Sequence, residues 1–271
     1  MRAPTRLLGL ATAGLGWAWF EAGWVRLETL EVPLEDLPRE LSGLRIAHLS
    51  DFHLGVPGRG AVAVDRAVAW VEEQQPDLTL ISGDLLTRSS GERQLREIIA
   101  RLPSCYAILG NHDLAISRDP FSERTFLHEL APATLLSDNG VTIDMRGRRV
   151  YIAGADPRSR WVRERRQPAD LAVSRSEADL RILVAHYPLL VDQLPPGAFD
   201  LVVAGHMHDG QICLPYPGGK LRLAHLGARY TRGIYRRPAG VLHVSAGLGT
   251  TFVPFRFAAR PEATELVLQP A

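Results

Sequence analysis

The chain has 271 residues, of which 46% are hydrophobic, so it can bury the core of one large α/β domain. Its formal net charge is +1 and its pI is about 7.9, which argues against a nucleic-acid-binding protein with a strongly basic surface. Cys105 and Cys213 are far apart and outside any C-x-x-C pattern, so neither a zinc knuckle nor a disulfide framework is predicted.

The first 25 residues form an apolar segment that follows Arg2 and Arg6. Leu7–Phe20 is apolar or small throughout, and three of the five tryptophans lie between residues 17 and 24. A membrane-spanning helix needs about 20 apolar residues, so this length is borderline. We predict a membrane anchor or an interfacial helix over residues 1–25, with a cleaved signal peptide or an ordinary packed helix as alternatives.

Residues 26–43 are typical of a short strand followed by a proline-containing connector, and residues 44–271 are predicted to form one domain. Short apolar runs are typical of buried strands and cover Leu44–Leu49, Leu78–Ile81, Tyr106–Leu109, Val150–Ala153, Ile182–Ala185 and Leu201–Ala204. Helical patterns separate the early runs and cover Ala61–Gln74, Glu92–Leu102 and Ser122–Leu130. After His208, short alternating runs favour antiparallel strands. This alternation predicts an α/β sandwich.

Five short polar motifs follow these apolar runs. They are Asp51-Phe52-His53, Gly83-Asp84, Gly110-Asn111-His112-Asp113, His186 and Gly205-His206-Met207-His208. Because open α/β sheets bind ligands at the carboxyl ends of their strands, we expect the five motifs to meet at one rim. Carboxylate oxygen, amide oxygen and imidazole nitrogen suit Mn²⁺, Fe or Zn²⁺, and a carboxylate between two half-sites can bridge two ions. The motifs therefore predict a dinuclear metal site.

The order of these motifs, D-x-H, G-D, G-N-H, H and G-H-x-H, closely resembles that of the calcineurin-like metallophosphoesterase superfamily. The resemblance implies a four-layer α-β-β-α sandwich with mixed sheets and two divalent metal ions, Mn²⁺ in preference to Fe or Zn²⁺. By this resemblance one ion would be bound by Asp51, His53, Asp84 and His208, and the other by Asp84, Asn111, His186 and His206.

The same resemblance implies an enzyme in which a hydroxide that bridges the ions attacks phosphorus. His112 would then protonate the leaving oxygen or stabilise it electrostatically. Asp113 would orient His112 or one of the metal ligands.

Runs outside the motifs resemble a bacterial, membrane-associated branch of that superfamily, the YkuE/YaeI-like proteins, which are related to UDP-2,3-diacylglucosamine pyrophosphatases. They include LSGLRIAHLSD at 41–51, GHMHDGQI at 205–212 and SAGLG at 245–249. The branch predicts a phosphodiesterase or pyrophosphatase that acts on a lipid-linked substrate at the bacterial cell membrane, on either face. The alternatives are a cytoplasmic phosphoesterase for a soluble nucleotide or other phosphodiester, and a non-catalytic scaffold of the same fold.

A few charged residues outside the ligand set have two interpretations each. Asp209 replaces a glycine that is usual in the branch; its carboxylate either alters the reach of the substrate or faces solvent. Arg88 contacts substrate phosphate or is simply solvated. The arginine-rich loop at 156–166 caps the phosphate cleft, meets anionic lipid or is solvated. His48 is predicted to be a hydrogen-bonded core residue, and His225 and His243 to be structural or to border the cleft.

Overall fold

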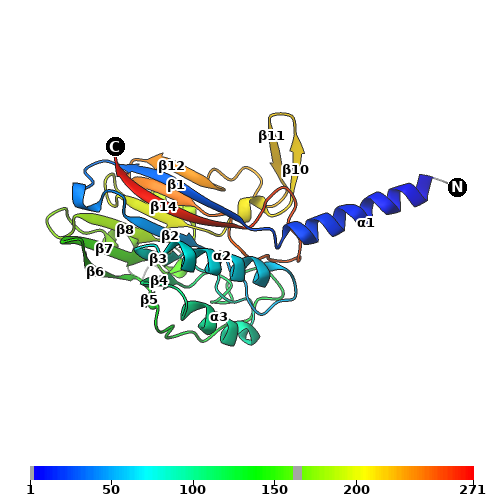
Figure 1. Ribbon diagram of the computed structural model, residues 1–271, viewed down its shortest axis with the longest axis horizontal. Coiled ribbons are helices and arrows are strands. Elements are labelled where there is room, and N and C mark those ends of the chain that lie inside the picture. The colour runs from blue at the N-terminus through cyan, green and yellow to red at the C-terminus, as the bar shows by residue number, and fades with distance from the viewer. Residues whose placement is uncertain (1–2, 161–166) are drawn as a thin grey trace.

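The computed structural model describes residues 3–160 and 167–271, so most of the arginine-rich loop around Trp161 lies outside the described residues. Within the described residues, two six-stranded mixed sheets face one another and a two-stranded hairpin stands apart from them (Figure 1). The hairpin consists of β10 (Cys213–Tyr216) and β11 (Gly219–Arg222).

The first sheet has the order β1-β14-β2-β3-β4-β5. Its strands are β1 (Arg26–Leu34), β14 (Glu262–Pro270), β2 (Arg45–Leu49), β3 (Leu78–Ile81), β4 (Cys105–Ile108) and β5 (Thr134–Leu136). Strands β2 to β5 are parallel, whereas β14 runs antiparallel to β2 and parallel to β1. The short strand expected at the start of residues 26–43 is present as the edge strand β1, where Pro33 is tolerated because an edge strand can spare a ladder hydrogen bond.

The second sheet has the order β12-β13-β9-β8-β7-β6. Its strands are β12 (Gly233–Arg237), β13 (Gly240–Val244), β9 (Leu201–Ala204), β8 (Leu180–Val184), β7 (Arg148–Gly154) and β6 (Asn139–Met145). The four central strands are parallel, and β6 and β12 pair antiparallel at the two edges. The carboxyl ends of β8 and β9 therefore lie together, as those of β2, β3 and β4 do in the first sheet.

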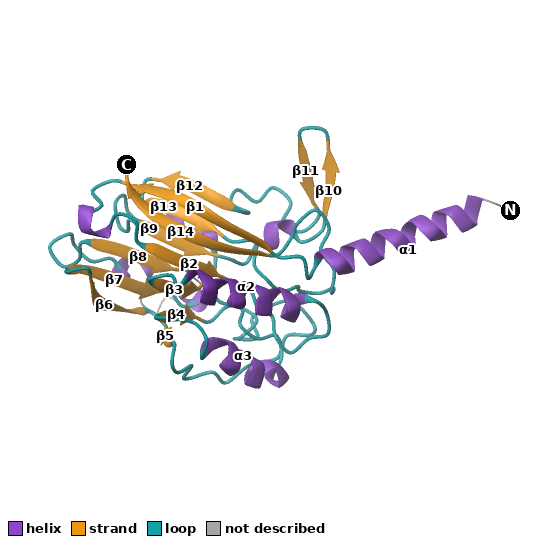
Figure 2. Ribbon diagram, viewed as in Figure 1, coloured by secondary structure: helices purple, strands orange, loops and turns teal. Residues whose placement is uncertain are grey.

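Hydrophobic side chains fill the space between the sheets and cover both outer faces. The helices α2 (Gly60–Gln74) and α3 (Glu92–Ile99) cover the first sheet (Figure 2), and α2 does so because Val64, Val68 and Val71 recur at helical spacing. On the second sheet, the short 3₁₀ helices η4 (Pro168–Leu171) and η5 (Pro188–Gln193) and adjoining loops form the outer layer. The predicted α/β fold with mixed sheets is confirmed, with 3₁₀ turns in its fourth layer.

The helix predicted over Ser122–Leu130 is wrong, because this segment is irregular. Its backbone bonds to neighbouring loops instead of to itself: the N–H of Glu123 donates to Thr87 O (2.8 Å) and the N–H of Thr125 to Asp113 O (3.0 Å). Tertiary hydrogen bonds have overridden a weak helical pattern.

The helix α1 (Ala3–Glu21) projects from the body of the molecule, and only its C-terminal end is anchored (Figure 1). The buried carboxylate of Glu21 accepts the N–H of Ala259 (2.8 Å), and Ala18 O accepts the N–H of Arg256 (3.0 Å). Among the described residues, no helix combines the length and the apolar character that crossing a membrane requires. The exposed aromatic side chains on and just after this end of the helix are Trp17, Trp19, Phe20 and Trp24.

Candidate metal centre

The predicted ligands lie just beyond the carboxyl ends of five strands, three in the first sheet and two in the second. Asp51 and His53 follow β2, Asp84 follows β3 and Asn111 follows β4. From the second sheet, His186 follows β8, and His206 and His208 follow β9. The structure brings all seven side chains together at the rim that the two sheets share, as the sequence predicts.

The backbone at this rim is strained. Five of the seven predicted ligands have a positive φ, between 47° and 70°, namely Asp51, His53, Asp84, His206 and His208. Non-glycine residues in this region are uncommon and cluster at functional sites, because surrounding structure must hold them there. Two glycines give the room that is needed: a Cβ on Gly110 or Gly205 would collide with the carboxylate of Asp84 or Asp51, respectively.

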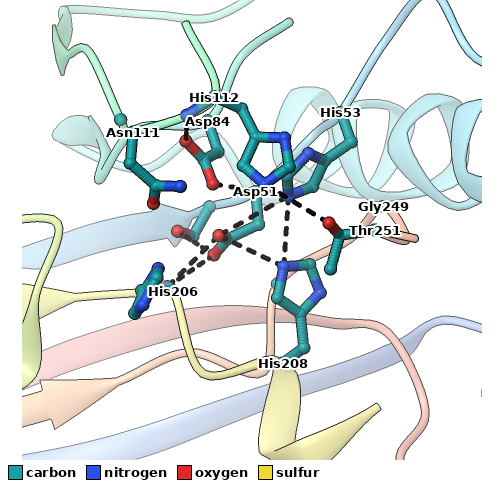
Figure 3. A network of polar contacts seen from close by, with 12 residues as sticks. Asp51, His53, Asp84, Asn111, His112, His206, His208, Gly249 and Thr251 are labelled. Atoms are coloured by element: carbon teal, nitrogen blue, oxygen red, sulfur yellow. Dashed lines mark hydrogen bonds and ion pairs between the residues drawn. The ribbon is translucent and has the colours of Figure 1, made fainter. Parts of the chain in front are cut away.

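One half of the cluster consists of Asp51, His53 and His208. The Nε2 atoms of His53 and His208 are 3.1 Å apart, and His208 Nε2 lies 3.4 Å from Asp51 Oδ1 (Figure 3). His53 Nδ1 contacts Thr87 Oγ1 at 2.9 Å, which fixes the ring with Nε2 directed inward. Three ligand atoms thus converge on one point from two sheets.

The other half consists of Asn111, His186 and His206. His186 Nε2 lies 2.7 Å from Asn111 Oδ1 and 3.2 Å from His206 Nδ1. His186 Nδ1–H donates to Ser82 O (2.9 Å), so that its Nε2 carries the lone pair that faces the cluster.

Asp84 lies between the two halves. Its Oδ2 is 3.5 Å from His53 Nε2 and 3.3 Å from His186 Nε2, while its Oδ1 accepts the backbone N–H of His112 (2.8 Å). One carboxylate oxygen therefore faces both groups of imidazoles.

The electrostatics of the cluster suit bound cations. Burial lowers the pKa of His53 well below its usual range and that of His206 to about 3, which favours the neutral imidazole that coordinates metals. Burial also tends to lower the pKa of His186, but the negative charges of Asp84 and Asp51 outweigh burial and raise this pKa to about 9. The buried carboxylates thus favour an added positive charge, and the donor set of carboxylate, amide and imidazole fits divalent metal ions.

His112 stands beside the cluster without being one of the predicted ligands. Its ring packs edge-on against His53, with the ring centroids 4.5 Å apart, and its buried Nδ1 has no hydrogen-bond partner among the described residues. Its Nε2 lies 2.9 Å from Ser117 Oγ and 3.3 Å from Thr251 Oγ1. Thr251 Oγ1–H in turn donates to Asp119 (2.8 Å).

Asp113 has a different set of contacts from the one expected for an orienting partner of His112. Its carboxylate accepts the backbone N–H groups of Leu85 (3.1 Å), Leu86 (2.7 Å) and Gly110 (2.8 Å). Burial and the neighbouring Asp84 raise its pKa to about 7. Asp113 therefore fixes the two turns that present Asp84 and Asn111.

The partners of His112 were missed from the sequence. Ser117, Asp119 and Thr251 belong to no recognisable motif, and 132 residues separate Asp119 from Thr251. A second missed group lies behind Asp51: Ser50 Oγ donates to Asp51 Oδ2 (2.5 Å), and Ser50 accepts from Ser82 (2.7 Å).

The structure shows the surroundings of three residues for which the sequence allowed two interpretations. Asp209 is buried and forms ion pairs with Lys220 and Arg222, so it anchors the β10–β11 hairpin and does not face solvent. Arg88 lies near Glu123, with 3.7 Å between Nε and a carboxylate oxygen, away from the metal ligands. His225 borders the cleft, with its ring centroid 5.4 Å from that of His206.

Comparison with known proteins agrees with this geometry. The family model described as calcineurin-like phosphoesterase matches residues 44–210. The chain therefore belongs to this family, and its buried His/Asp clusters make it a metal-dependent phosphoesterase by class.

Three relatives illustrate the breadth of the family. The chain is 32% identical to a "transmembrane protein with metallophosphoesterase domain" of Danio rerio over 89% of its own length, but it spans only 57% of that relative. It is 26% identical to the metallophosphoesterase YkuE of Bacillus subtilis, with 96% of this chain and 92% of YkuE covered. It is also 26% identical to the phosphodiesterase YaeI of Escherichia coli, with 95% and 93% covered. The predicted relation to YkuE and YaeI is confirmed.

Proposed function

We propose that this protein hydrolyses a phosphodiester or pyrophosphate bond in a membrane-derived, lipid-linked substrate. The observation that carries the proposal is the position of Asp84, whose Oδ2 faces imidazoles of both groups at 3.3 and 3.5 Å. A phosphodiesterase among the relatives, YaeI, supports the bond type.

In this proposal the seven residues hold two divalent ions, Mn²⁺ in preference to Fe or Zn²⁺. Asp51, His53, Asp84 and His208 hold one, and Asp84, Asn111, His186 and His206 hold the other, so that Asp84 bridges them. When bound, such ions polarise phosphoryl oxygens and lower the pKa of water. Burial lowers the pKa values of His53 and His206, which favours the neutral form of these two imidazoles.

His112 is the proposed proton donor to the leaving oxygen. Its Nδ1 is buried, has no partner among the described residues and lies beside His53, whereas Ser117 and Thr251 hold its Nε2. In its protonated imidazolium form, a ring held at Nε2 and open at Nδ1 can deliver a proton in a defined direction.

The cleft and the helix α1 support a membrane substrate. The cleft has a volume of about 770 Å³, and apolar side chains of Ile116, Leu189, Leu226 and Phe252 lie around the ligands. In Figure 1, α1 and the β10–β11 hairpin both project from the end of the molecule that lies opposite the C-terminus of β14. Because β2 runs antiparallel to β14, β2 terminates at the same end as α1 and the hairpin. We propose that α1 binds a membrane as an interfacial helix through its exposed aromatic side chains.

A substrate panel tests the proposal. With Mn²⁺-loaded protein, hydrolysis of bis-p-nitrophenyl phosphate should be detectable, and kcat/KM for lipid-linked pyrophosphates should exceed that for soluble nucleotides by at least about tenfold. Equal or greater kcat/KM for nucleotides would favour a soluble substrate. Absence of hydrolysis across the panel with two bound ions would favour a non-catalytic scaffold.

A further inference from the structure

A second cavity adjoins the metal cleft. It has a volume of about 280 Å³, close to the lower end of the range of about 300–1,000 Å³ for ligand pockets. Its walls come from loops that are far apart in sequence, and its apolar lining consists of Val56, Pro57, Phe121, Phe252, Val253 and Pro254.

The cavity and the metal cleft share a wall. Thr251 and Phe252 line both, and Thr251 Oγ1 lies 3.3 Å from His112 Nε2. Thr87, which also lines the cavity, contacts His53 Nδ1 at 2.9 Å. The cavity thus lies next to the side of the centre on which His112 lies.

The polar groups of the cavity are occupied by the protein itself. Asp119 accepts the N–H of Phe121 (2.9 Å), the N–H of Phe252 (2.8 Å) and the hydroxyl of Thr251 (2.8 Å). Arg88 stands over the Phe121 ring at 5.6 Å and also lies near Glu123. These contacts connect the loop of Asp119 and Phe121 to the loop of Thr251 and Phe252. They leave a surface suited to an apolar ligand.

The rim of this second cavity is unusually apolar for a surface in contact with water. Phe121, Phe252 and Val253 are 47%, 52% and 43% exposed, respectively. Covering such side chains with a hydrocarbon chain removes apolar area from water on both partners, which is favourable.

We infer that this cavity binds the hydrocarbon chain of the alcohol that the substrate releases. The inference rests on the proposed function, in which His112 faces the leaving oxygen. A chain attached to that oxygen would continue past Thr251 into the cavity. In the reaction, water supplies a hydroxyl group to phosphorus, the bond from phosphorus to the alcohol oxygen breaks, and the alcohol leaves with a proton.

The test uses methyl 4-alkylphenyl phosphodiesters below their micelle concentrations, with methyl, butyl or octyl groups on the leaving phenol. These phenols have nearly equal acidity, so the series varies chain length alone. Each methylene that becomes buried should raise kcat/KM about fourfold. If about three to four of the seven additional methylenes of the octyl compound become buried, the octyl-to-methyl ratio in the wild-type, Mn²⁺-loaded protein should be on the order of 100.

Two variants and one control locate the effect. Val253→Trp fills the cavity and should bring the octyl-to-methyl ratio close to 1, and Phe121→Ala, which removes one wall, should lower it about tenfold. Val62→Trp, on the exposed side of α2, should retain the wild-type ratio. A flat profile in the wild type, or a steep profile that persists in Val253→Trp, overturns the inference. Failure to hydrolyse even the methyl compound overturns the proposed function instead.

Discussion

The two ring nitrogens of His112 have opposite environments. Nε2 is held by two hydroxyl groups, while Nδ1 is buried beside His53 without a partner among the described residues. Burial also lowers the pKa of this imidazole, against the opposing influence of Asp84 and Asp119. His112 also forms, with His53 and Asp84, a group of side chains that could hold a metal ion, so its proposed role as a proton donor must be separated from a role as a ligand.

Replacement of His112 by Asn should therefore separate turnover from metal binding. We expect kcat for bis-p-nitrophenyl phosphate to fall on the order of 100-fold, because the proton donor is lost. Metal content, measured by elemental analysis, should stay at the wild-type value. Unchanged turnover would remove His112 from the mechanism, and loss of one ion would make it a ligand.

Thr251 offers a matched pair of substitutions that tests how His112 is oriented. Thr251→Val removes the hydroxyl group between His112 and Asp119, and we expect kcat to fall about tenfold because the ring loses one of two positioning contacts. Thr251→Ser keeps the hydroxyl and should stay within about twofold of wild type. Equal losses in both variants would indicate a packing effect of the methyl group and contradict the positioning role.

The ligands and their orienting partners differ in how far sequence could predict them. The ligands Asp51, Asp84 and His186 each follow an apolar strand directly, so local motifs placed them at one rim. Thr251 and Asp119 come together only because two long loops fold over the rim, and no short pattern encodes that contact. The seven predicted side chains do converge, whereas the partners of His112 required the structure.

At the scale of elements, the two sheets are joined through a pair of buried histidines. His48 in β2 and His243 in β13 approach with 2.7 Å between their Nδ1 atoms, and His48 Nε2 lies 2.9 Å from Ser82 Oγ. Because Asp51 can only accept, Ser50 must donate to it, Ser82 to Ser50 and His48 Nε2–H to Ser82. His243 Nδ1–H then donates to His48, which leaves the buried His243 Nε2 without a hydrogen-bond partner in the described part of the chain.

This pair predicts a loss of stability in acid. Burial lowers the pKa of His48 from 6.5 to about 3, and burial and then His48 lower that of His243 well below 6.5. Below pH 6.5, the unfolded chain therefore binds protons at these two histidines, whereas the folded chain does not. The free energy of unfolding should consequently decrease as the pH falls from 6.5 towards 3. One such group contributes a slope of up to about 1.4 kcal/mol per pH unit.

Urea unfolding at pH 7.5, 6.0 and 5.0 measures this slope. His243→Leu removes one of the two buried groups and should make the decrease shallower than in the wild type under identical buffers. His128→Leu, which removes an exposed histidine, serves as the control and should keep the wild-type slope. A slope in His243→Leu equal to that of the wild type would contradict the assignment.

Strands were more predictable than helices and edges. Runs such as Leu78–Ile81 and Leu201–Ala204 are buried on both faces in parallel strands, which makes them continuously apolar in sequence. The edge strand β1 was expected to be short, but it covers Arg26–Leu34, because it pairs with β14 over its whole length. The helix predicted at 122–130 is absent, because the backbone of this segment bonds to other loops. Both differences arise where tertiary contacts decide the local structure.

For the molecule as a whole, the exposed aromatic residues around α1 lie at the end that carries the catalytic rim. Truncation of residues 1–24 removes these aromatic side chains, together with the contacts of Ala18 and Glu21 with the body. We expect the truncated protein to sediment with liposomes of bacterial lipid composition at least about tenfold less than the full chain.

Activity of the truncated protein towards bis-p-nitrophenyl phosphate should remain within about twofold of the full chain, which serves as the folding control. A full-length chain that does not bind liposomes would contradict the interfacial role of α1. It would leave the metal centre unaffected.

If the carboxylate of Asp84 is shared by two metal ions, its replacement must affect both, and the metal stoichiometry shows whether it does. Elemental analysis and calorimetric titration with Mn²⁺ should give two ions per wild-type chain and one each for His206→Ala and His208→Ala. Asp84→Asn should weaken both sites at least about tenfold, since its oxygen faces both groups of ligands. An Asp84→Asn protein that still binds two ions with wild-type affinity would show that Asp84 is not shared by the two sites.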